Sequence, residues 1–417
     1  MRSDWPIRTI AECASPEPYS TQIGPFGKAL MADQYSESGI PVLRGINVNQ
    51  GRFHDDDFVF IDSATAGRLS KFESFPGDVL LVHKGTLGQI GLMPNVRKYP
   101  RYIMGNSMMR VRCDATKLLP EYLYYWLSST EGQHYIFSRV SQVGVPQIQT
   151  PLTTLRQASL PVPPLSEQQK IVRILGTLDD KIDLNRSINE TLASMARAVF
   201  KSWFVDFDST LSNGGSTVPF GSIVKISRES LNPAEYPSES FDYYSIPAFD
   251  QSRLPAVEIG EHIKSNKFVV REDSVLLSKL NPRIPRVWMP QLSNDRRAIC
   301  STEFLVLRPN EAPSSREFLY DLCTSQSFLE VFATMVTGTS GSHQRVKPEY
   351  LEKMQVVVPS ESQIKRYTEI VGPLHARIAR GLEQSSNLGA VRDLLLPKFL
   401  SGAIRLQDIE EIAGVRV

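Results

Sequence analysis

The sequence predicts an α+β fold: two similar mixed α/β domains separated by two long antiparallel, coiled-coil-like α-helices and related by a pseudo-twofold internal repeat. Three observations lead to this fold class: the repeat itself, matching strand-like runs in both copies, and a long heptad pattern after each copy. Asp78–Leu81 returns 196 positions later as Ser274–Leu277, and Leu155–Pro163 returns as Leu351–Pro359. A repeat of this period indicates two similar domains, each followed by a similar helix.

Short strands separated by turns are expected in both domains. In the first copy the strand-like runs are Pro41–Leu43, Phe58–Ile61, Val79–Val82 and Met108–Val111, and one amphipathic helix is predicted over Pro120–Phe137. The second copy repeats this plan with Val275–Leu277, Phe304–Leu307 and a helix over Ser315–Phe332. The first copy also carries about 17 extra residues near Gly24–Gly51, which are expected in surface loops.

Two long helices give the clearest pattern, because apolar residues recur at alternating spacings of four and three. The first set of heptad positions is Ile171, Leu175, Leu178, Ile182, Asn185, Asn189, Leu192, Ala196, Val199 and Trp203, and the second is Tyr367, Val371, Leu374, Ile378, Gly381, Ser385, Leu388, Arg392, Leu395 and Phe399. Both sets lose their apolar character at the same central positions, so the helices are expected to pack on each other in antiparallel orientation. The two asparagines would then fix the register at some cost in stability.

The length and continuity of these helices can also be predicted. A helix over Ser166–Val205 would be roughly 60 Å long at the usual rise per residue. In the second helix, Pro373 follows Gly372, which predicts a kink or a helix start at that point.

The composition is that of an ordinary globular protein. Of the 417 residues, 41% are apolar and 22% are charged, which suits two or three domains with their own cores. No run of about 18 apolar residues is present, so no membrane segment is expected, and the first residues lack an apolar secretory segment. The four cysteines have no CxxC spacing, which favours reduced thiols in a cytoplasmic protein over disulfides or zinc.

The net charge of +1 neither requires nor excludes nucleic acid, but basic residues cluster locally. Residues 76–112 contain six Lys and Arg against one acid, and residues 264–308 contain nine against four. Because the surplus falls in equivalent stretches of both copies, it predicts a phosphate-binding surface, with solvated surface charge as the alternative.

Motifs for catalysis are missing from the sequence. The Pro-Pro-aromatic tetrapeptide of DNA methylation has only a distant counterpart in Asn281–Ile284, and the phosphate-binding GxxxxGK[ST] motif is absent. Asp179–Lys181 resembles part of a metal-dependent nuclease pattern, but it lies within the heptad pattern, where an exposed helix face is the better interpretation. No catalytic residue and no metal site is therefore predicted, and the chain is interpreted as a binding protein.

Motifs along nearly the whole chain resemble those of a single family, the DNA specificity (S) subunits of Type I restriction–modification systems. Pro163–Ile171 with Leu178–Ile182 is similar to the start of that family's central conserved helix, and Phe200–Phe207 to its end. Leu395–Gly402 with Ile404 and Arg405 looks like the family's C-terminal close. Gly77–Leu81 with Lys84–Gly88 looks like its first recognition domain, and Tyr243–Asp250 like the opening of such a domain. The second copy has Lys279–Arg283 in place of Lys84–Gly88, which implies that the two domains read different sequences.

The resemblance implies target-recognition domains at residues 1–164 and 212–359, a central conserved helical region at 165–211 and a C-terminal one at 360–417. Each recognition domain would bind one half of a bipartite, asymmetric double-stranded DNA target. The helices would set the spacer length and dock the modification (methyltransferase) subunits, of which two are expected. The chain itself would be non-catalytic and without a cofactor. S-adenosylmethionine would bind to the modification subunits, and ATP and magnesium to a restriction subunit where one is present.

The residues expected to contact DNA are polar side chains after the repeated strand and in the Gly/Gln loops before the long helices. Arg, Asn and Gln suit base edges, whereas Lys mainly contacts phosphates. In the first domain these residues are Lys28, Arg44, Lys84, Thr86, Asn106 and Gln147. In the second domain they are Tyr243, Lys279, Arg283, Arg286, His343, Gln344 and Arg345. An ordinary surface role is the alternative for each residue taken singly.

Two other classes of function stay open on the sequence alone. One is a single-chain DNA methyltransferase or nuclease with an atypical active site, and activity of the purified chain on plasmid DNA would favour it. The other is a coiled-coil adaptor that does not bind DNA. Unchanged DNA affinity after charge reversal at Lys84, Arg283 and Arg286 would favour the adaptor.

Overall fold

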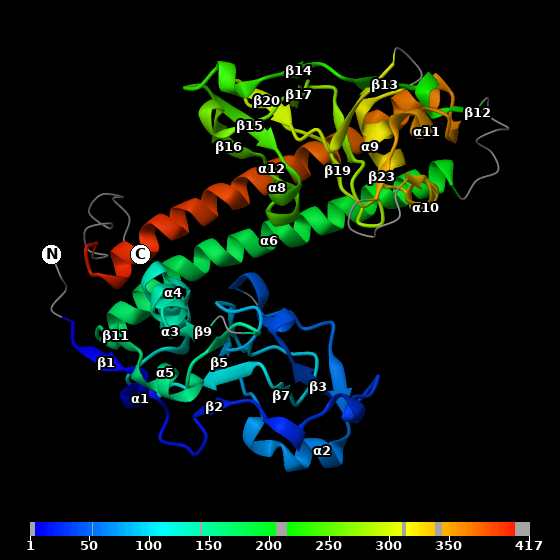
Figure 1. Ribbon diagram of the computed structural model, residues 1–417. Coiled ribbons are helices and arrows are strands. Elements are labelled where there is room, and N and C mark those ends of the chain that lie inside the picture. The colour runs from blue at the N-terminus through cyan, green and yellow to red at the C-terminus, as the bar shows by residue number, and fades with distance from the viewer. Residues whose placement is uncertain are drawn as a thin grey trace. The chain divides into compact units, whose positions relative to one another are not determined.

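The computed structural model describes residues 5–51, 53–141, 144–205, 215–310, 314–337 and 344–404 (Figure 1). The chain divides into two compact units. Unit 1 comprises Met1–Asp180 and Leu388–Val417, and unit 2 comprises Lys181–Asn387. Helix α6 (Leu165–Phe204) begins in unit 1 and ends in unit 2, whereas α12 (Glu361–Leu400) begins in unit 2 and ends in unit 1. Each unit therefore contains one domain and a portion of both long helices.

Unit 1 contains two main sheets. The four-stranded antiparallel sheet has the order β2 (Thr21–Ile23), β8 (Met108–Val111), β5 (Val79–Val82), β6 (Ile90–Leu92). The three-stranded sheet has the order β4 (Val59–Ile61), β3 (Ile40–Leu43), β7 (Ile103–Met104), and β3 pairs with β7 in parallel. Two ribbons are β1 (Ile7–Thr9) with β11 (Ser159–Pro161), and β9 (Val140–Ser141) with β10 (Gln147–Ile148). Its helices are α1 (Ile10–Cys13), α2 (Ser63–Arg68), α3 (Pro120–Ser128), α4 (Thr130–Phe137) and α5 (Pro151–Gln157).

Unit 2 is built from the corresponding parts. Its four-stranded antiparallel sheet has the order β13 (Val224–Ser227), β21 (Phe304–Pro309), β18 (Val275–Ser278), β19 (Val287–Trp288). The other sheet has the order β14 (Ser230–Leu231), β17 (Lys267–Val269), β20 (Arg297–Cys300), β15 (Ser240–Tyr244), β16 (Ala256–Ile259). The ribbons are β12 (Ser216–Pro219) with β24 (Gln355–Val358), and β22 (Val336–Thr337) with β23 (Arg345–Val346). Its helices are α8 (Ile246–Gln251), α9 (Arg316–Thr324), α10 (Gln326–Thr334) and α11 (Pro348–Glu352).

The two units share one topology. Their four-stranded sheets have the same strand order, with β2, β8, β5 and β6 matching β13, β21, β18 and β19. In both units the first strand pairs with the strand that precedes a long helix, as β1 does with β11 and β12 with β24. The parallel pair β3–β7 likewise corresponds to β15–β20. The second sheet is larger in unit 2 because β14 and β17 are added to it. The predicted internal repeat is confirmed.

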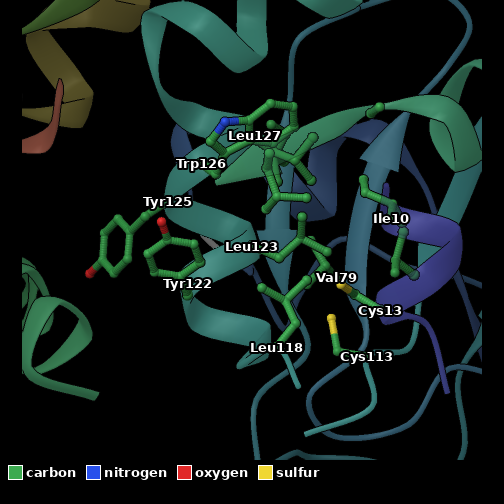
Figure 2. Close-up of a cluster of buried hydrophobic side chains, with 14 of the residues drawn as sticks. Ile10, Cys13, Val79, Cys113, Leu118, Tyr122, Leu123, Tyr125, Trp126 and Leu127 are labelled. Atoms are coloured by element: carbon green, nitrogen blue, oxygen red, sulfur yellow. The ribbon is translucent and has the colours of Figure 1, made fainter. Parts of the chain in front are cut away.

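The repeated apolar strand is buried on both faces. In β5, Val79 and Leu81 lie in one hydrophobic cluster, while Leu80 and Val82 lie in a second cluster with the three-stranded sheet. Since successive strand residues point to opposite faces, a strand between two cores has to be apolar throughout. Figure 2 shows the first cluster, where Leu118 and Leu123 pack around Val79. All four cysteines of the chain are free and buried.

The single helix predicted over Pro120–Phe137 is in fact two helices, and the same holds for Ser315–Phe332. Ser129 separates α3 from α4 because its extended backbone ends one helix, while its side chain accepts a hydrogen bond from the Gly132 amide and caps the next. Ser325 does the same between α9 and α10, accepting from the Phe328 amide. Serine is a favoured N-cap residue for this reason. The prediction of one continuous helix was therefore wrong in both copies.

The two long helices pack against each other within each unit. In unit 1, Ile171 and Leu175 of α6 share a hydrophobic cluster with Phe399 of α12. In unit 2, the rings of Phe200 and Tyr367 lie 6.0 Å apart. Residue numbers fall along α12 as they rise along α6, so the helices are antiparallel, as predicted. None of the predicted heptad residues is fully exposed.

The alternative that the second helix starts at Pro373 was wrong. Helix α12 runs without interruption from Glu361 to Leu400, so it begins 12 residues before the proline and continues through it. The proline side chain is exposed, whereas Val371 before it and His375 after it are buried. Tertiary contacts therefore outweigh the loss of one backbone hydrogen bond.

The central positions of the helix pair in unit 2 are polar and buried. Asn185 is 0% exposed and its Nδ2 donates to Gln384 Oε1 at 3.1 Å. The Asn189 side chain is buried beside Gly381, where a Cβ atom would clash with its amide. The backbone of α12 at Gly381 therefore lies directly against the side chain of Asn189 in α6.

Replacing Gly381 by alanine is expected to lower the free energy of unfolding by about 1–3 kcal/mol, since the added methyl overpacks against Asn189. Gly389→Ala is the matched control on the same helix, because no described atom outside that helix lies within 4 Å of the Cβ it would add. The control is expected to stabilise the protein by about 0.5–1 kcal/mol through helix propensity. Urea denaturation of the two variants measures the difference, and equal effects would argue against close packing at Gly381.

In the part of the chain that the structure describes, no helix combines the length and apolar character needed to cross a membrane.

Candidate nucleic-acid interface

A turn of the same construction follows the central strand of the four-stranded sheet in each unit. In unit 1 the Gly85 amide donates to the Pro146 carbonyl at 2.9 Å, and in unit 2 the Asn281 amide donates to the Gln344 carbonyl at 2.9 Å. Both turn residues have positive φ, 91° at Gly85 and 48° at Asn281. Glycine and asparagine are the residues that tolerate this conformation best. The two turns are therefore equivalent features of the repeat, although their sequences differ.

In unit 1 several of the predicted DNA contacts lie at this turn or next to it. Lys84 and Gln147 form a bridge between antiparallel segments, and both side chains are exposed. The His83 amide donates to the Ser107 carbonyl at 2.8 Å, which places the loop containing Asn106 next to the turn. Asn106 and Thr86 are also exposed. The loop after β5, the loop before β8 and the strand β10 thus meet at one edge of the domain.

Two further predicted residues border this edge. A Cβ atom at Gly45 would lie 3.0 Å from Thr86 Oγ1, so the residue after Arg44 touches the turn. The guanidinium of Arg44 is partly engaged already, since Nη2 donates to the Asp57 carbonyl. Lys28 is exposed, and Asn106 Nδ2 donates to the nearby Leu30 carbonyl at 3.3 Å.

The equivalent turn of unit 2 gathers a different set of side chains. The Lys279 amide donates to the Glu303 carbonyl at 3.0 Å, and its own carbonyl accepts from the Val346 amide at 3.0 Å. Leu280 and Arg345 form the bridge that corresponds to Lys84 and Gln147. The Gln344 and Arg345 segment therefore lies beside Lys279, as the corresponding segment does in unit 1.

The three arginines predicted as DNA contacts in unit 2 differ in how strongly acidic side chains of the protein bind their guanidinium groups. Arg286 is bound by Asp250 through two hydrogen bonds of 2.7 and 2.8 Å, and its side chain is only 11% exposed. Arg345 is held by Glu303, with Nη2 to Oε1 at 3.0 Å. Arg283 is exposed in the same turn. Among these three, Arg283 has the greatest freedom to reach a DNA phosphate or base.

Tyr243 does not join this group. Tyr243 is half-buried on β15 and packs on a small cluster of Phe241, Ile263 and Ile299. Lys267 Nζ lies 5.4 Å from the ring of Tyr243, and burial raises the pKa of the Tyr243 hydroxyl. These contacts are those of a core residue. His343 lies outside the residues that the structure describes.

Many of the clustered basic residues form ion pairs with acidic side chains of the same unit. Arg112 donates to both carboxylate oxygens of the buried Asp78, at 2.8 and 3.0 Å, and Arg110 is buried beside the same carboxylate. Arg101 is bound by Glu73. In unit 2, Arg296, Arg297 and Arg308 pair with Asp242, Glu239 and Asp273. Counting charges along the sequence could not reveal partners that are distant in the chain.

Sequence reasoning missed several residues that shape the two turns. Gln89 accepts a hydrogen bond from Thr86 Oγ1 at 3.2 Å, and Asp250 and Glu303 hold the arginines of unit 2. Ser107 and Glu303 are 196 positions apart, and their carbonyls accept equivalent hydrogen bonds from the amides of His83 and Lys279. Aligning the two copies position by position would therefore have found this second site. The described residues contain no group of three or more His, Cys, Asp or Glu that could hold a metal ion.

Comparison with known proteins finds that the chain is similar to members of one family. Residues 25–194 match the family model described as Type I restriction modification DNA specificity domain. The chain is 22% identical over 367 residues to the Type I restriction enzyme MjaIX specificity subunit of Methanocaldococcus jannaschii, covering 80% of this chain and 79% of that protein. It is 36% identical over 151 residues to the HindI specificity subunit of Haemophilus influenzae, which is 34% of this chain and 32% of that protein.

The fold agrees with a solved structure as well. The S subunit of a Type I restriction–modification system from M. genitalium superimposes with a TM-score of 0.58 at 15% identity, over 95% of this chain and 96% of that one. At this identity the likeness concerns the fold alone. Together with the family model that matches residues 25–194 and the sequence relatives, these findings show that the chain is similar to the DNA specificity subunits of Type I restriction–modification systems.

Proposed function

We propose that this chain is the DNA-recognition subunit of a Type I restriction–modification complex, in which each domain reads one half of a bipartite, asymmetric target. The observation that carries the proposal is the equivalent turn in the two units, held by the same backbone hydrogen bonds at Gly85 and Asn281 but furnished with different side chains. A common framework with divergent polar residues is what two readers of different half-sites require.

The exposed residues of the two turns suit DNA in different ways. Lys84 and Arg283 are exposed cations that suit phosphate oxygens, and Arg283 also has the fork geometry for a guanine edge. Thr86, Asn106 and Gln147 offer donors and acceptors for bases on the same edge of unit 1. Arg286 and Arg345 act mainly in holding the unit 2 turn in shape, because Asp250 and Glu303 occupy their guanidinium groups.

The long helices suit the remaining roles of the subunit. Helices α6 and α12 each contain 40 residues and connect the two domains, so they can set the length of the nonspecific spacer. A rigid connection makes binding of both half-sites bivalent only when its length matches the gap between them. Exposed apolar side chains such as Leu184, Met195 and Leu394 on these helices provide surfaces for modification subunits, two of which are expected.

The chemistry of the complex belongs to other subunits in this proposal. The chain would bind no cofactor of its own. S-adenosylmethionine would bind to the modification subunits, which methylate a base flipped out of the duplex. ATP and magnesium would act in a restriction subunit, where the system contains one.

The experiment that tests the function maps methylated bases across the genome of cells with and without this gene. A split motif with a fixed gap that disappears on deletion is the expected result. Purified chain incubated with plasmid DNA, S-adenosylmethionine and magnesium is expected neither to methylate nor to cut it. Methylation by the isolated chain would instead indicate the single-chain enzyme.

A further inference from the structure

The segment Gly24–Leu30 of unit 1 passes beside the candidate interface and is anchored at both ends. At its start the Gly24 amide donates to the Met108 carbonyl at 2.8 Å. At its end Leu30 is buried and its carbonyl accepts from Asn106 Nδ2 at 3.3 Å. The loop is therefore held against the residues between β7 and β8, which include one of the predicted DNA contacts.

The start of this loop also lacks room for any side chain. A Cβ atom at Gly24 would clash with the Gly105 carbonyl, so the backbone of the loop lies directly on the turn before β8. Gly27 has a positive φ of 57°, which glycine adopts without strain and which turns the chain after Phe26. The Ala29 amide donates to the Phe26 carbonyl at 3.1 Å and closes this turn. The loop is thus a fixed structure that presents its central residues outward.

Phe26 is the large apolar residue that this loop exposes. Its side chain is 60% exposed although it is large and apolar. Its ring contacts the imidazole of His83, with centroids 6.4 Å apart. His83 itself is buried, with Nε2 3.1 Å from the Asn106 carbonyl oxygen, and burial lowers the pKa of His83, so the ring is neutral at pH 7. Phe26 therefore rests on a neutral, fixed side chain and offers the rest of its ring to solvent.

The described residues of unit 2 form a different structure at the corresponding position. After β13, the chain of unit 2 forms the edge strand β14, in which Ser230 and Leu231 pair with β17. The preceding Glu229 is bound to Arg271. In unit 1 the segment after β2 leaves the sheet and runs to the candidate interface, whereas the corresponding segment after β13 in unit 2 is part of a sheet. Among the residues that the structure describes, the Gly24–Leu30 loop is therefore specific to the first domain.

We infer that Phe26 is a specificity-determining residue that makes an apolar contact with a base of the half-site read by the first domain. The inference rests on the proposed function. An exposed aromatic ring has few side-chain torsions to fix on binding and gains most from a partner with an apolar surface. Bases offer such a surface in the thymine methyl group and in their flat faces. Lys28, two residues further on, and Lys84 supply the positive charge that draws the DNA backbone to this edge.

The test measures DNA affinity of the full chain in complex with its modification subunits. Three duplexes are used: the mapped target, a duplex with one half-site scrambled, and a duplex with the other half-site scrambled. The variants are Phe26→Ala and Phe26→Leu. Val96→Ala is the matched control, because Val96 is 91% exposed in the same unit and also loses apolar surface. Thermal unfolding verifies that each variant is folded.

Phe26→Ala is expected to weaken binding to the intact target by about 10- to 100-fold, the effect of losing one aromatic–base contact. Scrambling the half-site read by the first domain should then reduce the affinity of the variant by a smaller factor than that of the wild-type protein. Scrambling the other half-site should reduce the affinity of both proteins by the same factor. Phe26→Leu should retain part of the affinity, since leucine keeps an apolar side chain. Val96→Ala should bind like the wild-type protein.

Two results would overturn the inference while leaving the proposed function intact. One is a Phe26→Ala variant that matches Val96→Ala on all three duplexes, which would make Phe26 an ordinary exposed apolar residue. The other is equal weakening on all three, which would indicate a contact without sequence preference. If the wild-type complex itself fails to discriminate the three duplexes, the proposed function fails and the inference fails with it.

Discussion

Replacing Asp78 by alanine is expected to lower the free energy of unfolding by roughly 3–5 kcal/mol, because it leaves buried positive charge without its partner. Asp78 is 0% exposed and accepts hydrogen bonds from Arg112 and from the Phe75 amide. Arg110 Nη1 lies 3.7 Å from the same carboxylate. Burial lowers the pKa of Arg110 to about 10, so this guanidinium is still charged at neutral pH. Without Asp78, only carbonyl acceptors such as that of Tyr19 would remain for Arg110.

A matched control for this prediction exists in the other copy. Asp273 pairs with Arg308, which is the counterpart of Arg112 at an offset of 196 residues, but both side chains are about 40% exposed, at 40% and 37%. Asp273→Ala is expected to cost less than about 1 kcal/mol, as exposed ion pairs do. Urea denaturation of the full chain measures both variants. Equal losses for the two substitutions would show that burial does not govern the strength of these pairs.

Reversing the charge of Lys84 and Arg283 together is expected to weaken DNA binding by at least about 100-fold at physiological salt, since each cation is taken to release one counterion from DNA and its reversal adds repulsion. The dependence of log affinity on log salt concentration should become shallower by about two in slope. Both side chains are exposed in equivalent turns, so the folded structure should be retained. Fluorescence anisotropy over a range of salt concentrations measures both quantities.

The control for the charge reversal is the double variant Arg8→Glu and Lys353→Glu, which changes the net charge equally at exposed positions outside the two turns. It should lose much less affinity. Co-purification with the modification subunits should be unchanged in both double variants. An equal loss in the control would mean that net charge, rather than the two turns, attracts DNA, and undiminished binding in both would favour the adaptor that does not bind DNA.

Much of the fold could be predicted because it is encoded in local patterns that occur twice. Val79–Val82 and its repeat are apolar throughout since both faces of the strand are covered. The long helices show their heptads because one continuous stripe of each is buried. Ser129 and Ser325 were overlooked as helix breaks, because serine within an amphipathic pattern differs little from an exposed polar position until its backbone is known.

The candidate site was predictable in outline for a different reason. Polar residues after a buried strand lie at the edge of a sheet, and the bridge between Lys84 and Gln147 bears out their proximity. The engagement of Arg286 by Asp250 and of Arg345 by Glu303 could not be foreseen, since each pair joins segments distant in sequence. Tyr243 could not be oriented either, because a shift of one position along a strand reverses the face to which a side chain points. Phe26 was missed since exposure is a property of the folded loop.

The most direct test of the account changes one turn at a time and reads the methylated motif in cells. Thr86→Ala with Gln147→Ala alters the turn of unit 1, and Arg283→Ala with Gln344→Ala alters that of unit 2. Genome-wide methylation mapping of each strain is expected to show relaxed sequence at only one half of the split motif, a different half for each pair of substitutions, with the gap unchanged. Relaxation of both halves by either pair would contradict the assignment of one half-site to each domain.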